Sequence, residues 1–304
     1  MFKNTLDNKR YYTLNYFFRQ KFKQKVIKIP LDVNSSCPNQ LNGGCIFCSN
    51  RSTSNISDAT LDIVKQFNKG KEILEKKWPN SLYIAYFQSG TNTYGSVKTI
   101  KKFVDKLLVI NNVVGISIAT RPDTLSDDWL AYLNDLNKKT FLTVELGLQS
   151  SNEKTLNFIN RGHTVNDFTK AVLKLQKRNI FTVAHIIDGL PYENKNDMIN
   201  TIKYLNNLKI NGIKIHMLYI SKNTKLARIY ENKNFPILSK EEYIDIVCEQ
   251  LRNLDENIVI ERITGDPIVD ELIEPKWLVK KFCVLNDIDK EMVKRNIYQG
   301  DLVK

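Results

Sequence analysis

Short apolar runs alternate with longer amphipathic stretches between residue 25 and about residue 220. Each short run is rich in β-branched and aromatic residues, and several are apolar almost continuously, which is typical of strands covered on both faces. We therefore predict six strands, at residues 26–33, 82–87, 113–119, 141–148, 181–187 and 212–219. Their alternation with helical stretches predicts repeated βα units and a parallel sheet.

The stretches between these strands have the periodicity of helices that pack on a sheet. In one of them, a single apolar stripe at helical spacing contains Ile100, Phe103, Val104, Leu107 and Leu108. Six strands joined by right-handed helical crossovers curl toward a barrel, so we expect the α/β class and a partial parallel (β/α)6 barrel. An open doubly wound sheet is the alternative.

The alternation stops after residue 220. Ser239 and Glu242 form the capping box of a helix that continues through Leu254, the stretch NIVIER predicts a short strand, and residues 276–296 predict a last helix. No Gly/Ser/Pro-rich linker precedes this region, so we expect an α+β cap on the barrel. The predicted division is a basic aromatic N-terminal arm at 1–24, the barrel at 25–220 and a C-terminal capping segment at 221–304.

Composition narrows the cellular setting. The chain has five cysteines, an odd number, and no signal peptide precedes them, which points to a reducing compartment and a cytoplasmic protein. Nowhere do eighteen apolar residues run together, so we expect no membrane segment and no membrane partner.

The formal net charge of +12 is unevenly distributed, because residues 1–30 hold eight basic side chains and one acidic side chain. Rings such as Tyr12, Phe17 and Phe22 stand among these cations. Cations for phosphates and flat faces for unstacked bases suit single-stranded or looped RNA. An aromatic arm that packs on the protein itself explains the same pattern, and the sequence leaves both interpretations open.

Three cysteines, Cys37, Cys45 and Cys48, lie close together directly after the first predicted strand. Three thiolates at one end of a strand can hold three corners of an iron-sulfur cube and leave the fourth iron without a protein ligand. A zinc site needs four ligands, usually as two close pairs, and only one such pair is present. Zinc or a disulfide stays the alternative. Cys248 and Cys283 lie in helix-like stretches, and we expect both in the core.

Small or polar residues follow five successive predicted strands. In parallel βα folds, reactive groups gather at the carboxyl ends of the strands. Glycine and asparagine also make ordinary turns, which accounts for any one of these segments but poorly for all five. The segments are Cys37 and residues 88–95, 119–123, 145–150 and 188–194.

Distinctive stretches occur along the chain from about residue 10 to residue 300. They are RYYTLNY, GGCIFCS, AYFQSGTNT, SIATRPD, VELGLQS, INRGHT, HIIDGLP, IKIHMLY, ERITGD, PKW, VLNDIDKE and YQG. In this combination the chain resembles the radical S-adenosylmethionine (SAM) superfamily, in the branch shared with oxygen-independent coproporphyrinogen oxidases and Elongator-type tRNA-modifying enzymes. Within that branch it resembles a family of bacterial proteins of the YhcC and YtqA (MnmL) type.

The resemblance implies that the three clustered cysteines bind a 4Fe-4S cluster whose open iron chelates the amino and carboxylate groups of SAM. An electron from the cluster, delivered by a donor such as flavodoxin or ferredoxin, cleaves SAM to a 5′-deoxyadenosyl radical. The implied cofactor-binding residues are Phe47 near the adenine, Ser89, Gly90 and Thr91 near the methionine amino group, and Gln149 and Arg161 at the ribose and carboxylate of SAM.

Three further residues are candidates for catalysis. Glu145 lies four positions before Gln149 on one strand, so both side chains face the same way, and Glu145 serves either the site or an internal ion pair. His185 is a candidate proton carrier, because Asp188 follows it at the carboxyl end of the strand. A hydrogen-bonded core histidine is the alternative interpretation, and it applies equally to His163 and His216.

The resemblance also implies a substrate. It indicates tRNA, with the 5-carboxymethylaminomethyl group of the wobble uridine converted toward the aminomethyl form. One alternative keeps the radical chemistry and makes the substrate a small metabolite or a protein residue. The other is a zinc-stabilised RNA-binding module without SAM chemistry.

Overall fold

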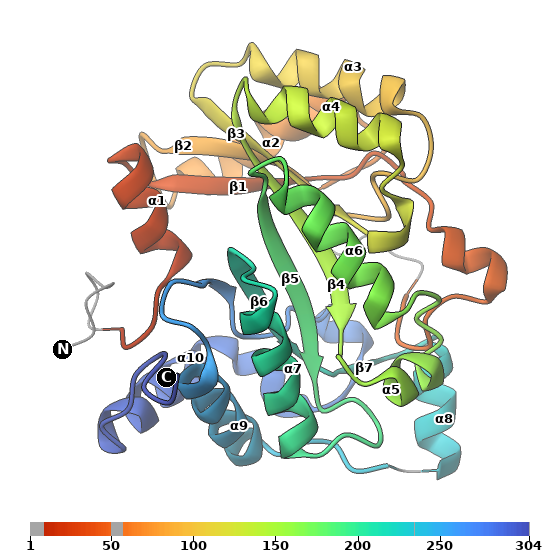
Figure 1. Ribbon diagram of the computed structural model, residues 1–304, viewed down its shortest axis with the longest axis vertical. Helices are drawn as coiled ribbons and strands as arrows, with labels where there is room; N and C mark the ends of the chain where they lie inside the picture. The colour runs from red at the N-terminus through yellow and green to blue at the C-terminus, as the bar shows by residue number, and fades with distance from the viewer. Residues whose placement is uncertain (1–8, 50–56, 234, 304) are drawn as a thin grey trace.

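A curved, fully parallel sheet forms the centre of the molecule (Figure 1). The computed structural model describes residues 9–49, 57–233 and 235–303. In these residues the main sheet has seven strands in the order β1-β2-β3-β4-β5-β6-β8. The strands are β1 (Val26–Leu31), β2 (Leu82–Phe87), β3 (Val113–Thr120), β4 (Phe141–Gln149), β5 (Phe181–Asp188), β6 (Gly212–Met217) and β8 (Val259–Arg262). The predicted α/β class and partial parallel barrel are confirmed.

The seventh strand corrects the predicted number of six. The stretch NIVIER, which we assigned to the cap, supplies β8, and Val259 pairs in parallel with Gly212 of β6. This strand satisfies backbone groups that β6 would otherwise expose at the sheet edge. The sheet thus ends at β1 on one side and at β8 on the other, and the barrel stays open between them.

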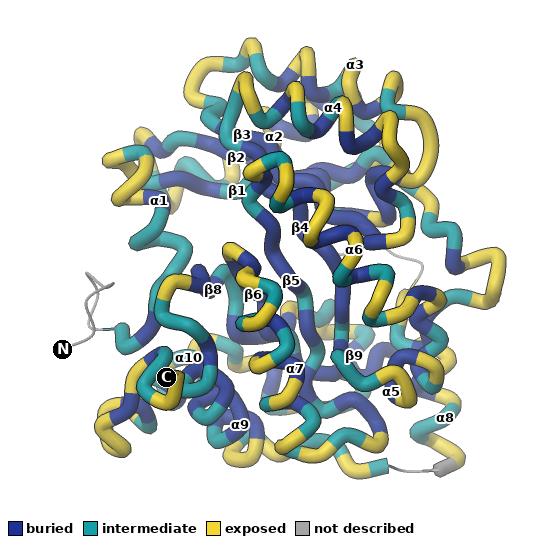
Figure 2. The backbone as a smooth tube through the Cα atoms, viewed as in Figure 1, coloured by how far each residue is buried: buried dark blue, intermediate teal, exposed yellow. Residues whose placement is uncertain are grey.

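Helices cover the outer face of the sheet, with their exposed sides toward solvent (Figure 2). A small antiparallel pair, β7 (Ile220–Ser221) with β9 (Leu272–Glu274), lies outside the main sheet. The helices are α1 (Leu14–Phe22), α2 (Ile63–Glu75), α3 (Val97–Leu108), α4 (Asp127–Asn137), α5 (Glu153–Phe158), α6 (Val165–Gln176), α7 (Lys195–Asn207), α8 (Lys225–Lys233), α9 (Lys240–Asn253) and α10 (Lys281–Lys294).

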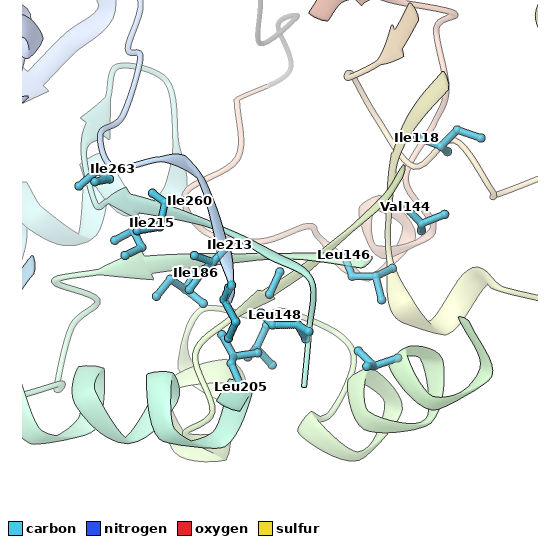
Figure 3. Close-up of a cluster of buried hydrophobic side chains, with 14 of the residues drawn as sticks. Ile118, Val144, Leu146, Leu148, Ile186, Leu205, Ile213, Ile215, Ile260 and Ile263 are labelled. Atoms are coloured by element: carbon cyan, nitrogen blue, oxygen red, sulfur yellow. The ribbon is translucent and has the colours of Figure 1, made fainter. Parts of the chain in front are cut away.

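Alternate residues of each strand separate the core from the barrel interior. Val144, Leu146 and Leu148 of β4 are fully buried between the sheet and its helices (Figure 3). The residues between them, such as Glu145 and Gly147, face the other way because side chains alternate along a strand. The barrel interior is therefore the face that carries the polar side chains.

Helix α1 closes the amino-terminal end of the barrel. Its Phe18 packs with Val26, the first residue of β1, and with Ile84, the third residue of β2. The ring centroid of Phe17 lies 6.0 Å from that of Phe141 and 5.1 Å from that of Phe181. These α1 rings are thus used for packing, and the packing interpretation of the arm is the one the fold supports. Residues 1–8 of the predicted arm lie outside the described residues.

The C-terminal segment contains the predicted capping box, since the Ser239 and Glu242 side chains and backbones bond reciprocally at the start of α9. Cys248 of α9 is fully buried, as expected. Cys283 is exposed, which corrects its assignment to the core. The buried stripe of α10 begins at Val284 and continues at i+4, so the preceding residue points away from it. Within the described ranges, we find no helix long and apolar enough to span a membrane.

Candidate active site

The cysteine segment lies where the sheet's strands end. Cys37 follows β1 and precedes a 3₁₀ turn at Pro38–Asn42, and the segment then passes Cys45 and Cys48. The arrows of β4 and β5 point toward the end of the molecule that holds α5 and α8 (Figure 1). These two helices fix the segment between them.

Ile46 anchors the segment. Its backbone N–H donates to the Ile159 carbonyl at 3.0 Å, and its carbonyl accepts from the Leu226 N–H at 2.8 Å. Its side chain is buried with these two residues, and Phe47 packs against the same cluster. Because Ile159 follows α5 and Leu226 belongs to α8, the barrel and the C-terminal segment jointly position the cysteines on either side of Ile46.

Cys45 is the buried member of the trio, and its sulfur has polar neighbours. Asn39 Nδ2 lies 3.5 Å from Cys45 Sγ, and Arg161 Nη1 lies 3.8 Å from it. The hydrogen bond from Cys48, together with the Arg161 charge, outweighs burial and lowers the pKa of the Cys45 thiol to about 5. The same bond and burial raise the pKa of Cys48. The pair therefore favours one thiolate with one retained proton.

In the portion of the chain that the structure describes, no three His, Cys, Asp or Glu side chains converge closely enough to hold one metal ion. A four-iron cube does not require its cysteine ligands to share one metal ion, because each thiolate binds a separate iron at its own corner. The electrostatic setting suits thiolates, since Arg121 and Arg161 both lie within range of Cys45.

Arg121 braces the loop that carries Arg161. Its guanidinium makes two 2.9 Å bonds to the Asp123 carboxylate and donates to the carbonyls of Arg161 at 2.8 Å and Gly162 at 3.0 Å. Arg121 is thereby committed to holding the loop. Arg161 donates through Nη2 to the Gly147 carbonyl at 2.8 Å, and its buried Nε has no partner among the described residues. That Nε leaves a charged donor available to an anionic group.

The end of β4 is irregular where Arg161 meets it. The register with β5 shifts between Gly147 and Gln149, and Gln149 has a φ of 75°. A Cβ on Gly147 would lie 2.6 Å from Arg161 Nη2 and 2.8 Å from Gln149 Nε2. The absence of a side chain at Gly147 thus lets both predicted cofactor-binding side chains fold over this strand. Strained backbone of this kind persists where the surroundings enforce it.

The loop after β2 approaches the segment before Cys37 closely. Gly90 has a φ of 73°, and a Cβ there would lie 2.0 Å from the Ser35 carbonyl oxygen. Asn92 Nδ2 donates to the carbonyls of Phe87, Ser89 and Ala119, which fixes the loop against β3. Ser89 and Thr91 are buried in this loop. The structure therefore places Ser89, Gly90 and Thr91 beside the segment that leads to the cysteines.

Below this edge, one polar side chain from each strand of the main sheet enters a buried layer inside the barrel. Glu145 is its centre: its carboxylate accepts from Ser117 Oγ at 2.7 Å, Tyr86 Oη at 2.7 Å, Lys28 Nζ at 2.9 Å and His185 Nε2 at 2.8 Å, and also from Lys214. Burial opposes ionisation of Glu145, but Lys214 and Lys28 outweigh it and hold its pKa well below the ordinary value. We call this set the charged layer: Lys28, Tyr86, Ser117, Glu145, His185, Lys214 and Glu261.

The structure separates His185 from Asp188. His185 bonds to Glu145 inside the barrel, and its ring centroid lies 5.5 Å from that of His216, whose Nε2 has no partner in the described chain. Asp188 instead accepts from Gln250 of α9 at 2.7 Å, on the helix-covered side of the sheet. Burial raises the pKa of Asp188 to about 8. The two residues therefore do not form a pair, because they are three positions apart on a strand.

His163 is the third histidine, and it serves the Arg161 loop. Its Nε2 lies 3.0 Å from the Gly147 carbonyl and its Nδ1 lies 3.2 Å from the Thr164 carbonyl. Burial, together with the charge of Arg161, lowers the pKa of His163 to about 4, so the ring is neutral at physiological pH.

Two residues that position this site were not predicted from the sequence, namely Arg121 and Asn39. For Arg121, the available signal was the ATRPD stretch that follows the third strand.

A cavity of about 600 Å³ opens between β1 and β8. Four members of the charged layer line it, namely Lys28, Tyr86, Lys214 and Glu261, and Gln88, the residue before Ser89, lies at its wall. The cavity therefore leads from the open side of the barrel past the charged layer to the loop after β2.

Comparison with known proteins identifies two family domains in the chain. Residues 37–205 match the model of the Radical SAM superfamily, and residues 210–294 match the model of the Radical_SAM C-terminal domain. The uncharacterized protein YtqA of Bacillus subtilis is 42% identical over 297 residues, which are 96% of this chain and 92% of that protein. The tRNA uridine(34) acetyltransferase of Methanocaldococcus jannaschii is 28% identical over 44% of this chain and 25% of that protein.

Among solved structures, the archaeal Elp3 of Methanocaldococcus infernus with an N-terminal deletion superimposes with a TM-score of 0.72 at 18% identity. The match covers 90% of this chain and 64% of that chain, so this protein spans slightly less than two thirds of the solved Elp3 chain. At this identity the likeness shows a shared fold.

Proposed function

This chain belongs to the radical SAM superfamily, and we propose that it modifies the wobble uridine of tRNA, converting a 5-carboxymethylaminomethyl group toward the aminomethyl form. Membership makes the chain an enzyme whose cofactors are a 4Fe-4S cluster and SAM. When bound, the cluster supplies the electron that cleaves SAM to a carbon radical. The remaining chemistry depends on the residues of this chain.

We assign Cys37, Cys45 and Cys48 as the cluster's protein ligands. The thiolate is the ligand form of cysteine, and the cation of Arg161 beside Cys45 favours it. The single observation that carries the proposal is this placement: the cysteine segment lies at the carboxyl edge of a parallel barrel, with two arginines in range of its buried sulfur.

The SAM-binding residues follow from the same edge. The buried Nε of Arg161 offers a charge-assisted bond to a carboxylate. Ser89, Gly90 and Thr91 present the loop after β2 to the amino group of SAM, Gln149 presents its amide to the ribose, and Phe47 presents its ring to the adenine. The close approach of Gly90 to Ser35 and the fold of Gln149 over Gly147 support these assignments.

We propose that the substrate lies against the charged layer inside the barrel. We propose that Glu145 positions Lys28, Lys214 and His185, so that its part in catalysis is indirect. His185 is the proposed proton carrier. Asp188, which bonds to Gln250 of α9, is proposed to act only by fixing the end of β5.

Two features support tRNA as the substrate. A relative that matches 44% of the chain is named for its action on tRNA uridine 34, and the fold is that of an archaeal Elp3. The carboxymethylaminomethyl group carries a carboxylate, and Lys28 and Lys214 line the cavity that would receive it. Removal of the carboxymethyl group would break its bond to the amine nitrogen. Loss of a hydrogen atom from the adjoining methylene to the SAM-derived radical, loss of one further electron to a one-electron acceptor and addition of water would leave the amine and a two-carbon aldehyde acid. We propose the cytoplasm as the compartment and flavodoxin or ferredoxin as the electron donor.

The ligand assignment is tested by anaerobic reconstitution with iron and sulfide, followed by reduction with SAM. We expect about four iron atoms per chain and release of 5′-deoxyadenosine. Cys48→Ala should lose both, whereas Cys283→Ala, which changes another exposed cysteine, should lose neither. A protein that holds zinc, or SAM cleavage that persists in Cys48→Ala, would refute the assignment.

The substrate is tested by the nucleoside profile of tRNA from cells that lack this protein. Accumulation of the carboxymethylaminomethyl wobble derivative, reversed by the wild-type protein and not by Cys48→Ala, is the expected result. An unchanged profile together with intact SAM cleavage would favour a small metabolite or a protein residue as the substrate.

A further inference from the structure

The open side of the barrel has a built rim. The cavity between β1 and β8 has no strand across it, because these are the two end strands of the main sheet. Trp78, in the turn after α2, lines one side of the cavity, and residues 261–262 and 266–268 line the other. Asp266 on that second side accepts from Lys281 Nζ at 2.6 Å, so the start of α10 lies beside the mouth.

Aromatic rings and ammonium groups alternate along this rim. Lys77 Nζ lies 4.6 Å from the Trp78 ring centroid and 5.9 Å from that of Phe282, so it connects the two sides of the mouth. Lys25 Nζ lies 5.4 Å from the Trp78 ring, and Lys281 Nζ lies 5.7 Å from the Phe282 ring. Phe282 is 64% exposed, so much of its side chain faces solvent and would gain by burial against a partner.

The cavity behind the rim is predominantly cationic. Its charged lining residues are Lys25, Lys28, Lys214 and Arg262 against Glu261 and Asp266. Within the charged layer, Glu261 is already shared between Lys28 at 2.6 Å and Lys214 at 3.7 Å. Glu145, just behind the lining, pairs with the same two lysines, and Asp266 is shared between Lys281 at 2.6 Å and Arg262 at 4.0 Å. With Lys77 and Lys281 of the rim included, the six cations still outnumber these three carboxylates. The net positive charge beside exposed rings complements a partner that is anionic and presents flat faces.

We propose that this mouth is the docking site of a single-stranded RNA loop, in which unstacked bases lie on Trp78 and Phe282 while Lys25, Lys77 and Lys281 contact the phosphates. Base stacking on aromatic rings together with lysine contacts to phosphates is the general mode of single-stranded nucleic acid binding. The inference rests on the proposed function and identifies the surface that serves it. The proposed RNA-binding surface is therefore the open side of the barrel. It is not the aromatic rings of α1, because these pack at the end of the barrel.

A labelled anticodon stem-loop RNA tests the site by fluorescence anisotropy across a salt series. For Phe282→Ala we expect about tenfold weaker binding, the size of one lost stacking contact. For Lys77→Ala we expect the slope of log affinity against log salt to fall by about 0.7, the share of one phosphate contact on a single strand. Each variant has a matched control: Val293→Ala removes a 55% exposed apolar side chain from the same helix α10, and Lys139→Ala removes an exposed lysine beside the start of β4.

SAM cleavage without RNA should be the same in all four variants, because none of them alters the cysteine edge. Wild-type RNA affinity in both rim variants, or equal losses in the controls, would overturn the docking site and leave the proposed function standing. The docking site would also be overturned if a fully base-paired RNA bound as tightly as the stem-loop. The same holds if polyglutamate displaced the labelled stem-loop as well as unlabelled stem-loop RNA does. Loss of RNA binding in the rim variants alongside an unchanged tRNA profile in deleted cells would instead contradict the proposed function and retain the docking site.

Discussion

Replacement of Glu145 by glutamine tests the charged layer most directly. The change keeps the shape of the side chain and removes its charge. In the native protein the Glu145 carboxylate accepts from Lys28 and Lys214 and from three uncharged donors, and its side chain has no exposed surface. The glutamine amide would direct N–H donors at groups that are themselves donors, and the two ammonium groups would retain only Glu261 as their acid partner.

The expected loss of stability follows from this arrangement. Removing one partner of a buried ion pair typically costs about 3–5 kcal/mol, because it leaves an uncompensated buried charge. That loss is a large part of the roughly 5–15 kcal/mol by which domains are stable. The pKa of Glu145 is lowered in the folded protein, so its stabilising effect is present above the unfolded value and is lost as the pH falls through the folded value. The difference in free energy of unfolding between wild type and Glu145→Gln should therefore become smaller as the pH falls through this range.

Urea denaturation of wild type and Glu145→Gln at neutral pH and at a pH below 4.5, the ordinary pKa of a glutamate carboxyl, measures both expectations. Glu241→Gln is the matched control, because its side chain is 78% exposed and its contact with Lys240 is 4.0 Å long, and its free energy of unfolding should hardly change. A second substitution, Lys214→Met, should restore part of the stability lost in Glu145→Gln by removing an unpaired ammonium. A loss below about 1 kcal/mol, no larger than that of an exposed pair, would show that the reasoning about the charged layer is wrong.

Two further predictions concern single positions. In Gly147→Ala the new Cβ would lie 2.6 Å from Arg161 Nη2 and displace Arg161. We therefore expect SAM cleavage, measured as 5′-deoxyadenosine release, to fall about a hundredfold. Cleavage at the wild-type rate would contradict the proposed role of Arg161. The pKa of Asp188 is raised to about 8 in the folded protein, so the stability that its neutral form contributes is fully present below the unfolded pKa and is lost as the pH rises toward 8. In urea titrations between pH 5 and pH 7, the free energy of unfolding of Asp188→Asn should therefore rise relative to that of the wild type by about 1.4 kcal/mol per pH unit. A difference in free energy of unfolding that does not change with pH would refute a neutral Asp188.

Local patterns in the sequence were sufficient for much of the fold. The six strands predicted from apolar runs were found within two residues of their expected ends, and Ser239 and Glu242 cap α9 as predicted. These features depend on neighbours a few positions apart, which is why periodicity and capping residues report them. The position of Cys37 after the first strand likewise follows from chain order, because a parallel sheet collects the ends of its strands at one edge.

Tertiary structure decided what lies opposite each apolar or polar face. The sequence by itself determined the barrel's repeating units and the cysteine spacing; it did not determine that NIVIER joins the main sheet, that α1 closes the barrel, that Cys283 is exposed, or that Asp188 faces Gln250. Residues that form the charged layer come from all seven strands and are far apart in the chain. Their contacts arise only when the sheet curves and brings alternate side chains together, and a one-dimensional pattern carries no record of that curvature.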